Sequence, residues 1–403
     1  MNHRNFEIDR LRAFAVLMTI YIHYSRVFFP WSISPNYHHG TTVLNIWNNS
    51  WTGVDLFLVI SGFVISKTIT SNIDILRSNS NSLAGFIKLF YIKRFYRIYP
   101  VAWSVFLFVI IASILFNKGG YFVTLENNIE AGIAIFTYTF NYYFAGGLYH
   151  GFTLSPFWSL SLEEQFYLLL PIFLILVKST RQRVIILLIL LSAITFIIRP
   201  LTHGDQLIFY TQTRCDGLIY GCLIYYLTQQ TWFDEIKIKA HSFSQFSKSC
   251  VVLVLIMALS SVTAIGFSNN IVIPLACMLA SLLVIIAASE ANVISFPQPI
   301  EKTLDYLGSR SYSLYLVHFP MFSLTQEIIY RISKAEQVVI GPGLEIYYTL
   351  LAFSLIFIVS EISYRFIEKP LMEKGRKIAQ SIHSKNKEKV DQKIYIKTLE
   401  EAA

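Results

Sequence analysis

Long apolar stretches constrain the fold of this 403-residue chain more than any other feature. They occupy residues 184–198, 251–265, 271–288 and 347–359, and each approaches the roughly 20 residues that a helix needs to cross a bilayer. Lipid offers no partner for a free backbone N–H or C=O group, so such segments must be helices. With 54% hydrophobic and only 14% charged residues, the composition also excludes an ordinary soluble domain. We therefore expect an all-α, polytopic transmembrane helical bundle.

The positive charges predict how this bundle crosses the membrane. About ten spanning helices can be drawn, and the short apolar segment 132–144 is left over as a re-entrant or buried segment. The spans cover about 10–29, 52–70, 96–116, 157–177, 183–199, 207–228, 249–267, 271–288, 311–332 and 345–366. Lys and Arg concentrate in alternate loops and in the tail, which the positive-inside rule explains if both termini are cytoplasmic. Residues 1–371 would form the transmembrane domain and 372–403 a charged cytoplasmic tail.

Several other functions are disfavoured by the same sequence. The net charge of +8 comes from bases between the spans and in the tail, so membrane orientation explains it and we expect no nucleic-acid partner. Asp9, Arg10 and Arg12 interrupt the first apolar stretch, which predicts a retained span rather than a cleavable signal peptide. The four cysteines have neither CxxC spacing nor a companion histidine cluster. We expect buried thiols, no disulfide and no metal.

Arg12 and His23 are ionisable residues inside the first predicted span, where charge is costly and often functional. Eleven helical steps return to within about 20° of the same face, with a rise of roughly 16 Å. A phosphate-bearing donor held at Arg12 could therefore present its reactive end near His23, which is suited to proton transfer. The alternatives are a packed core histidine and an orientation charge at Arg12 that pairs with Asp9.

A second basic group opens the third span. Arg94 and Arg97 share a helix face at i,i+3, and arginine forks suit phosphate oxygens. A positive-inside anchor explains the same residues equally well. Near the end of the last span, Arg365 and Glu368 could form an i,i+3 surface pair.

Acidic residues gather at the opposite ends of the spans. Asp55, Glu163 and Glu164 face outward by this topology, beside tryptophans and tyrosines, as would suit a polyhydroxylated acceptor such as a sugar. Arg214 and Asp216 enter the sixth span from the same side. The alternative is charge compensation at helix N-termini and pairing within the membrane, for example of Arg214 with a glutamate. The predicted arrangement has a basic inner vestibule, an acidic and aromatic outer one, and His23 between them.

These segments resemble the motifs of the acyltransferase 3 family of membrane acyltransferases. The resemblance begins with EIDRLRA at residues 7–13 and continues with the Arg-x10-His spacing of Arg12 and His23. Further matching motifs follow in order: 53–62 (GVDLFLVISG), Arg94-x-x-Arg97 with IYP at 98–100, 158–167 (WSLSLEEQFY), 311–318 (SYSLYLVH) and 364–370 (YRFIEKP). The match covers about residues 6–371, and several motifs in register are more specific than any one alone.

The resemblance implies a ten-helix acyltransferase that uses cytoplasmic acyl-coenzyme A, usually acetyl-coenzyme A, as a co-substrate rather than a tightly bound cofactor. It implies O-acylated glycans or lipid-linked sugars as products, in the cytoplasmic membrane of a bacterium. Catalytic roles carry over to Arg12, His23 and Glu368, and coenzyme binding to Arg94, Arg97 and Arg12. The motif positions Asp55, Glu163, Glu164 and His318 are acceptor-side candidates.

One feature departs from many relatives, which carry an extracytoplasmic SGNH-type hydrolase domain after the membrane domain. The segment after Pro370 is short and has no Gly-Asp-Ser nucleophile motif, which favours direct transfer by the membrane domain. The competing hypothesis is a transporter or flippase for a glycan or acyl group, with the same charges lining a conduit. No paired Gly/Pro-broken helices in matching halves support it.

Overall fold

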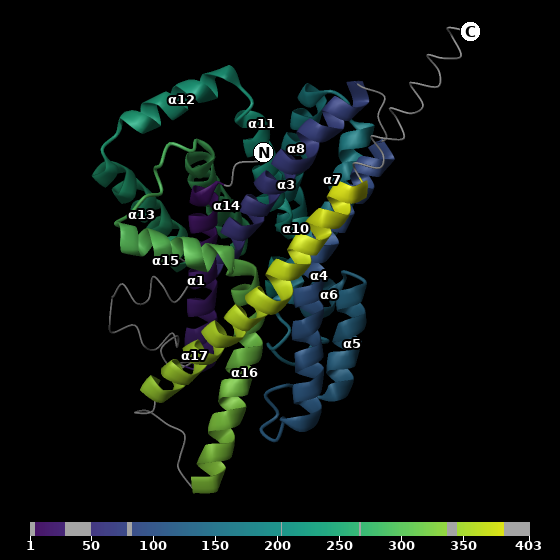
Figure 1. Ribbon diagram of the computed structural model, residues 1–403, viewed down its shortest axis with the longest axis vertical. Coiled ribbons are helices and arrows are strands. Elements are labelled where there is room, and N and C mark those ends of the chain that lie inside the picture. Colours follow the sequence, from purple (N-terminus) through teal and green to yellow (C-terminus); the bar gives the residue numbers. More distant parts are fainter. Residues whose placement is uncertain are drawn as a thin grey trace, which may run out of the picture.

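The computed structural model describes residues 5–28, 50–78, 83–202, 204–265, 267–336 and 345–382. Within these ranges the chain is helical and has no strand, which confirms the predicted all-α class. The helices are α1 (Phe6–Phe28), α3 (Gly53–Ser78), α4 (Leu83–Leu115), α5 (Leu125–Phe136), α6 (Phe140–Ala145), α7 (Phe157–Leu176), α8 (Thr180–Ala193), α9 (Arg199–Leu201), α10 (Thr211–Arg214), α11 (Asp216–Leu227), α12 (Thr231–Ser242), α13 (Gln245–Ser261), α14 (Asn269–Ala288), α15 (Gln298–Ser309), α16 (Ser311–Glu336) and α17 (Glu345–Ser363). Figure 1 shows them as one bundle.

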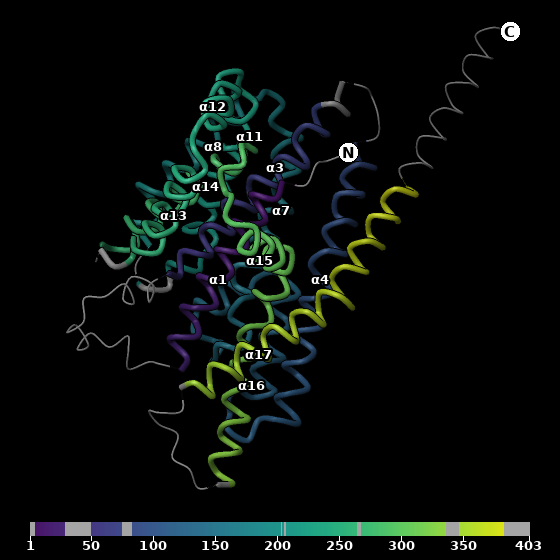
Figure 2. The backbone as a smooth tube through the Cα atoms, turned by 60° about the vertical axis from the view of Figure 1, so that its left-hand side comes forward, coloured from purple at the N-terminus to yellow at the C-terminus, as the bar shows by residue number. Residues whose placement is uncertain are grey.

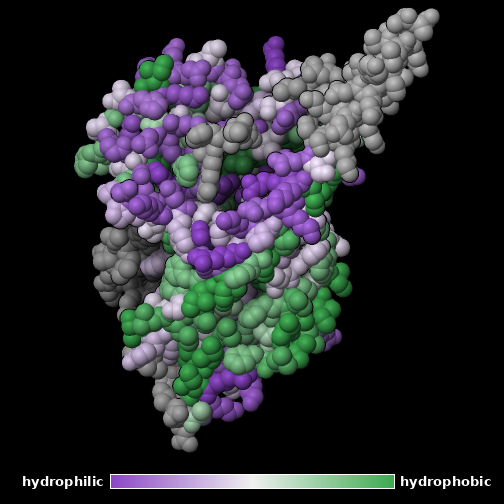
Figure 3. Space-filling view, viewed as in Figure 1, coloured by the Kyte–Doolittle hydropathy of each residue, from purple (hydrophilic) through white to green (hydrophobic). Residues whose placement is uncertain are grey.

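Apolar side chains cover a broad zone of the surface, and more hydrophilic surface lies above and below it in Figure 3. Six described helices are long and apolar enough to cross a membrane, and the α12–α13 pair, bent by 113°, would make a seventh. The protein is thus a membrane protein, but the ten predicted spans are not confirmed. Helices α1 and α16 fall outside the six, and both carry ionisable residues. Helix α11 has only 12 residues, too few for a hydrocarbon core about 30 Å thick.

The segment 132–144 does not form one continuous element. It begins within α5, passes through a turn at Thr137–Thr139 with Tyr138 at φ 58°, and ends in the short α6. Helix α5 has 12 residues, a rise of about 18 Å, which is too short to span. The predicted boundary at residue 371 lies inside a helical stretch that continues from α17 to Ile382. Residues 383–403 of the predicted tail lie outside the described residues.

Helix α1 occupies the middle of the bundle and packs against α3, α14, α15 and α16 (Figures 1 and 2). The amphipathic α15 lies against it so closely that a Cβ at Gly308 would be 2.0 Å from the Asp9 carbonyl oxygen. Arg10 reinforces this contact through Asp305 at 2.9 Å and Glu301 at 2.9 Å. The first turn of α1, which carries Arg12, is thereby held in place.

Glycines also bring α3 and α11 into backbone contact. A Cβ at Gly62 would lie 2.1 Å from the Leu218 carbonyl oxygen, and one at Gly221 would lie 2.3 Å from the Val59 carbonyl oxygen. Small residues permit such an approach between membrane helices. The consequence for the site is that α3, which carries Asp55, and α11, which carries Asp216, are fixed relative to each other.

Five short turns complete the described elements. The 3₁₀ turns are η3 (Ser50–Thr52), η5 (Asp205–Ile208) and η6 (Val262–Ile265), and the π-helical turns are η4 (Ile194–Ile198) and η7 (Tyr364–Glu368). Each π turn places a charged residue in the interior: Arg199 directly follows η4, and Glu368 ends η7. Such turns shift the facing of a helix and frequently occur at functional sites. Beyond η7 the C-terminal helix meets α4, where a Cβ at Gly375 would lie 2.5 Å from that of Tyr96 (Figure 2).

Candidate active site

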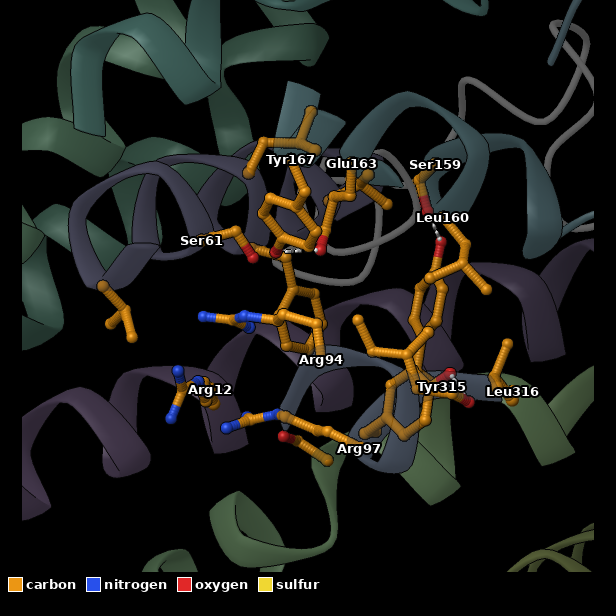
Figure 4. A pocket seen from close by; sticks show the side chains of 17 residues that line it. Arg12, Ser61, Arg94, Arg97, Ser159, Leu160, Glu163, Tyr167, Tyr315 and Leu316 are labelled. Carbon is orange, nitrogen blue, oxygen red and sulfur yellow. Dashed lines mark hydrogen bonds between the residues drawn. The ribbon is translucent and has the colours of Figure 1, made fainter. Parts of the chain in front are cut away.

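A basic pocket lies between helices α1, α3, α4, α7 and α16. Three arginines line it, Arg12 from α1 with Arg94 and Arg97 from α4 (Figure 4). Arg12 pairs with Asp9 at 2.7 Å, as the alternative explanation of its charge predicted. Arg94 stacks over the ring of Tyr167 at 5.0 Å, and neither it nor Arg97 forms an ion pair with any described residue. Two arginine charges therefore lack a direct counter-ion, which favours binding of an anion.

The pocket contains one of the predicted acceptor-side residues. Glu163 of α7 lines it opposite the arginines and accepts a hydrogen bond from the Tyr167 hydroxyl at 2.7 Å. Glu164 accepts from Tyr99 at 3.1 Å and lines a small apolar pocket beside α5. Both glutamates therefore lie in pockets between α7 and α4, and their outward placement beside an acceptor stays a prediction.

His23 lies at a second cavity, and a histidine from another helix holds it. Its Nδ1 lies 3.0 Å from Nε2 of His318 on α16, and the ring centroids are 5.2 Å apart with planes 10° from parallel. His318 is fully buried, and its Nδ1 lies 2.6 Å from the Tyr315 carbonyl oxygen. The structure thus brings together two residues that the sequence analysis assigned to different groups.

The tautomers of this pair follow from its partners. A carbonyl oxygen only accepts hydrogen bonds, so Nδ1 of His318 carries the proton. With His318 neutral, its Nε2 is an acceptor, so Nδ1 of His23 must donate to it. Nε2 of His23 is then left without a proton and can accept one. The hydrogen bonds from Tyr315 through His318 to His23 thus leave Nε2 of His23 as a proton acceptor.

The cavity at His23 is large, with a volume of about 890 Å³. Arg26 and His23 of α1, Trp51, Trp158 and Arg214 contribute to its wall. Val54 and Tyr315 line both this chamber and the basic pocket, and the Tyr315 hydroxyl lies 2.6 Å from Ser159 Oγ. The two cavities therefore meet at one partition, with Arg12, Arg94 and Arg97 on one side and His23 on the other.

Asp55 does not face the chamber as a free carboxylate. It pairs with Arg214 at 2.9 Å, and the nearby Arg199 pairs with Asp216 at 2.5 Å. All four side chains are at most 1% exposed. The predicted intramembrane pairing of Arg214 is confirmed, although the partner is an aspartate. Burial favours such pairing, and no Asp or Glu is among the described residues that line the chamber, so the outer vestibule of carboxylates stays a prediction.

Glu368 lies in the interior at the end of η7. It accepts a hydrogen bond from Ser313 Oγ of α16 at 2.6 Å and is 5% exposed. The proposed pair with Arg365 was wrong, since Arg365 bonds to Glu361 one turn earlier. The π turn explains the difference, because it rotates Glu368 away from the face that Arg365 occupies.

Sequence reasoning assigned no role to Glu7, although it lies in the first motif. Its carboxylate accepts hydrogen bonds from the backbone N–H groups of Asn292, Val293 and Ile294 at 3.0, 2.9 and 2.8 Å. It holds the segment between α14 and α15 against α1. The signal was present as an acidic residue at a helix start, but its partners lie 285 or more positions away.

The described residues contain no group of three or more His, Cys, Asp or Glu side chains arranged to hold a metal ion. The four cysteines are free thiols. The chemistry available to the protein therefore depends on its two cavities. We call them the arginine pocket, lined by Arg12, Arg94 and Arg97, and the histidine chamber, lined by His23.

The fold and these two cavities define a helical membrane protein with polar cavities inside its helix bundle. The chain belongs to the acyltransferase 3 family: the family's acyltransferase domain matches residues 5–365. This confirms the resemblance inferred from the motifs.

Two relatives illustrate the match. The peptidoglycan O-acetyltransferase OatA of Listeria monocytogenes is 27% identical over 388 residues, which covers 91% of this chain and 56% of the relative. The Bacillus subtilis protein named "Putative peptidoglycan O-acetyltransferase YrhL" is 26% identical over 402 residues, which covers 91% of this chain and 55% of the relative. The chain thus spans little more than half the length of these relatives. No solved structure matches it.

Proposed function

We propose that this protein transfers an acyl group, acetyl in the first instance, from acyl-coenzyme A to a hydroxyl group of a glycan or lipid-linked sugar. One observation carries the proposal: an arginine pocket and a histidine chamber meet at the partition formed by Val54 and Tyr315. An anionic donor and a neutral hydroxyl need environments of these two kinds. The family and the names of the relatives support the same chemistry.

The donor would bind at the arginine pocket. Arg94 and Arg97 have no ion-pair partner among the described residues, and their forks match the phosphate oxygens of a coenzyme. The pocket volume is about 90 Å³, below the roughly 300–1,000 Å³ of typical ligand pockets. It would hold only part of the donor, and the rest would extend from it. We place this pocket on the cytoplasmic side of a bacterial inner membrane, with both termini cytoplasmic, because acyl-coenzyme A is made there.

His23 would act as the general base in the chamber. Its Nε2 accepts the proton of the acceptor hydroxyl while the hydroxyl oxygen bonds to the acyl carbon. The bond from that carbon to the coenzyme sulfur breaks, and the thiolate takes the proton from His23. His318 acts as a positioning residue, since it fixes the tautomer of His23. In an acyl-enzyme route the acyl group would first be carried by His23 itself.

The direct test uses the purified full chain in detergent with acetyl-coenzyme A and peptidoglycan fragments, the acceptor class that the relatives' names suggest. The proposal expects release of free thiol together with an acceptor that is one acetyl group heavier by mass spectrometry. Intact-protein mass spectrometry without acceptor tests for an acylated chain and separates the two routes.

A transporter gives a different result in the same material. In proteoliposomes it would move a glycan or acyl donor across the membrane, with no thiol release and no change of acceptor mass. That outcome would overturn the proposal.

A further inference from the structure

The chamber at His23 has a positive character. No Asp or Glu occurs among the described residues that line it, whereas Arg26 and Arg214 both do. Arg26 is exposed and pairs with no described carboxylate. Arg214 and the three buried charges behind it balance one another, two arginines against two aspartates. The chamber therefore carries at least the uncompensated charge of Arg26.

Arg214 lines this wall and has buried hydrogen-bond donors without a partner. Asp55 contacts only its Nη2, and the buried Nε and Nη1 have no hydrogen-bond partner. The side chain is 1% exposed, so these donors have no compensating bulk water. Buried guanidinium donors without a partner are costly, and an anion in the chamber would satisfy them.

Two tryptophans enclose the guanidinium. Its Cζ lies 5.5 Å from the ring centroid of Trp51 and 5.8 Å from that of Trp158. Both rings also line the chamber. They hold the guanidinium plane in place and keep water away, which strengthens any charge-assisted hydrogen bond made there.

We propose that Arg214, held between Trp51 and Trp158, forms a subsite for an anionic group of the acceptor, a carboxylate or a phosphate. This inference rests on the proposed function, because it treats the chamber as the acceptor site. It narrows the acceptor class from glycans in general to acidic glycans or sugar phosphates. Arg26 adds a second positive charge on the same cavity and attracts the same ligand.

Binding measured without acyl-coenzyme A tests the subsite separately from catalysis. The probes are three oligosaccharides of equal length: one neutral, one with a single uronic acid and one with a single sugar phosphate. Calorimetry on the full chain in detergent is expected to show roughly tenfold or tighter binding of at least one acidic probe than of the neutral one. The tighter acidic probe identifies carboxylate or phosphate as the group recognised. Equal affinity for all three probes would overturn the proposal.

The double variant Asp55→Asn/Arg214→Gln removes a positive and a negative charge together, so the interior stays balanced. It is expected to lose the preference for the acidic probe. Arg214→Lys keeps the charge but lacks the guanidinium fork, and is expected to retain only part of the preference. Lys334→Gln, an exposed charge change on α16 outside the chamber wall, is the matched control and should keep it fully.

Size-exclusion profiles and thermal unfolding establish that each variant is folded. A folded double variant that retains the full preference would contradict the assignment. A wild-type chain that prefers acidic probes but transfers no acyl group would refute the proposed function and leave the subsite standing. A chain that transfers acyl groups to neutral and acidic acceptors with equal KM would refute the subsite alone.

Discussion

Because α3 and α11 are in backbone contact at Gly62, we expect the substitution Gly62→Ala to destabilise the protein. In Gly62→Ala the new methyl group would lie 2.1 Å from the Leu218 carbonyl oxygen and 2.8 Å from its carbonyl carbon. Both atoms belong to the backbone of α11, so no side-chain rotation relieves the clash. The two helices must separate by about 1 Å to reach ordinary contact. Since α3 carries Asp55, the movement also disturbs the buried ion pairs behind the chamber.

The magnitude follows from two opposing effects. Alanine in a helix interior gains about 0.5–1 kcal/mol over glycine. Overpacking costs about 1–3 kcal/mol, and a clash between backbones lies at the upper end of that range. We expect a net loss of about 1–2 kcal/mol, which for a chain of 403 residues corresponds to a fall in the unfolding midpoint of about 1–2 °C.

The assay is thermal unfolding of the purified chain in detergent, followed by fluorescence-detected size exclusion. Gly146→Ala is the matched control, because Gly146 has an ordinary φ of −72° and a Cβ there would lie 3.3 Å from its nearest neighbour. It should leave the midpoint at the wild-type value. If Gly62→Ala unfolds at the wild-type temperature, the close approach of α3 and α11 is not a feature of the protein.

Three further substitutions test separate parts of the account. Arg94→Gln should raise the KM for acyl-coenzyme A roughly 10- to 100-fold in steady-state kinetics, because one charge-assisted phosphate contact is lost. Lys88→Gln, outside the pocket, is the control and should leave this KM unchanged. Equal effects of the two substitutions would contradict the assignment of the pocket to the donor. His318→Gln should lower kcat at least about tenfold with little change in the KM for the donor, because the tautomer of His23 is no longer fixed. An unchanged kcat would refute the role of His318 as a positioning residue. Glu7→Gln should lower the free energy of unfolding by about 1–3 kcal/mol, because a neutral amide replaces a carboxylate that accepts hydrogen bonds from three backbone N–H groups. A denaturation series that gives the wild-type free energy of unfolding would show that this contact contributes little to stability.

The all-α fold class and the ion pair between Arg12 and Asp9 could be predicted from the sequence, because both depend on local properties of the chain. Apolar runs require helices in lipid, and an i,i+3 spacing alone links Arg12 to Asp9. The grouping of Arg12, Arg94 and Arg97 could also be predicted from the sequence, since all three charges lie at the same, predicted cytoplasmic, end of their spans. Hydropathy alone could not determine which helices reach across the bilayer, because α1 and α16 combine apolar length with interior charges.

The partners of buried charges could not be predicted in the same way. His23 meets His318 across 295 positions, and Asp55 of α3 meets Arg214 at the end of α10, far along the chain. Such pairs depend on helix rotation, which a single π turn alters, as Glu368 shows. A predicted topology orders the ends of helices but not the direction in which each side chain points, so it could not show that Asp55 is neutralised by Arg214.

The proposed role of His23 as the base for acyl transfer, oriented by His318, is tested by kcat for His23→Ala, with donor binding measured separately on the same folded protein. We expect transfer to fall about 10²- to 10⁴-fold with an unchanged Kd for acyl-coenzyme A, and we expect no such fall for His241→Ala on α12. A His23→Ala protein that folds, binds the donor and transfers acyl groups at the wild-type rate would contradict it.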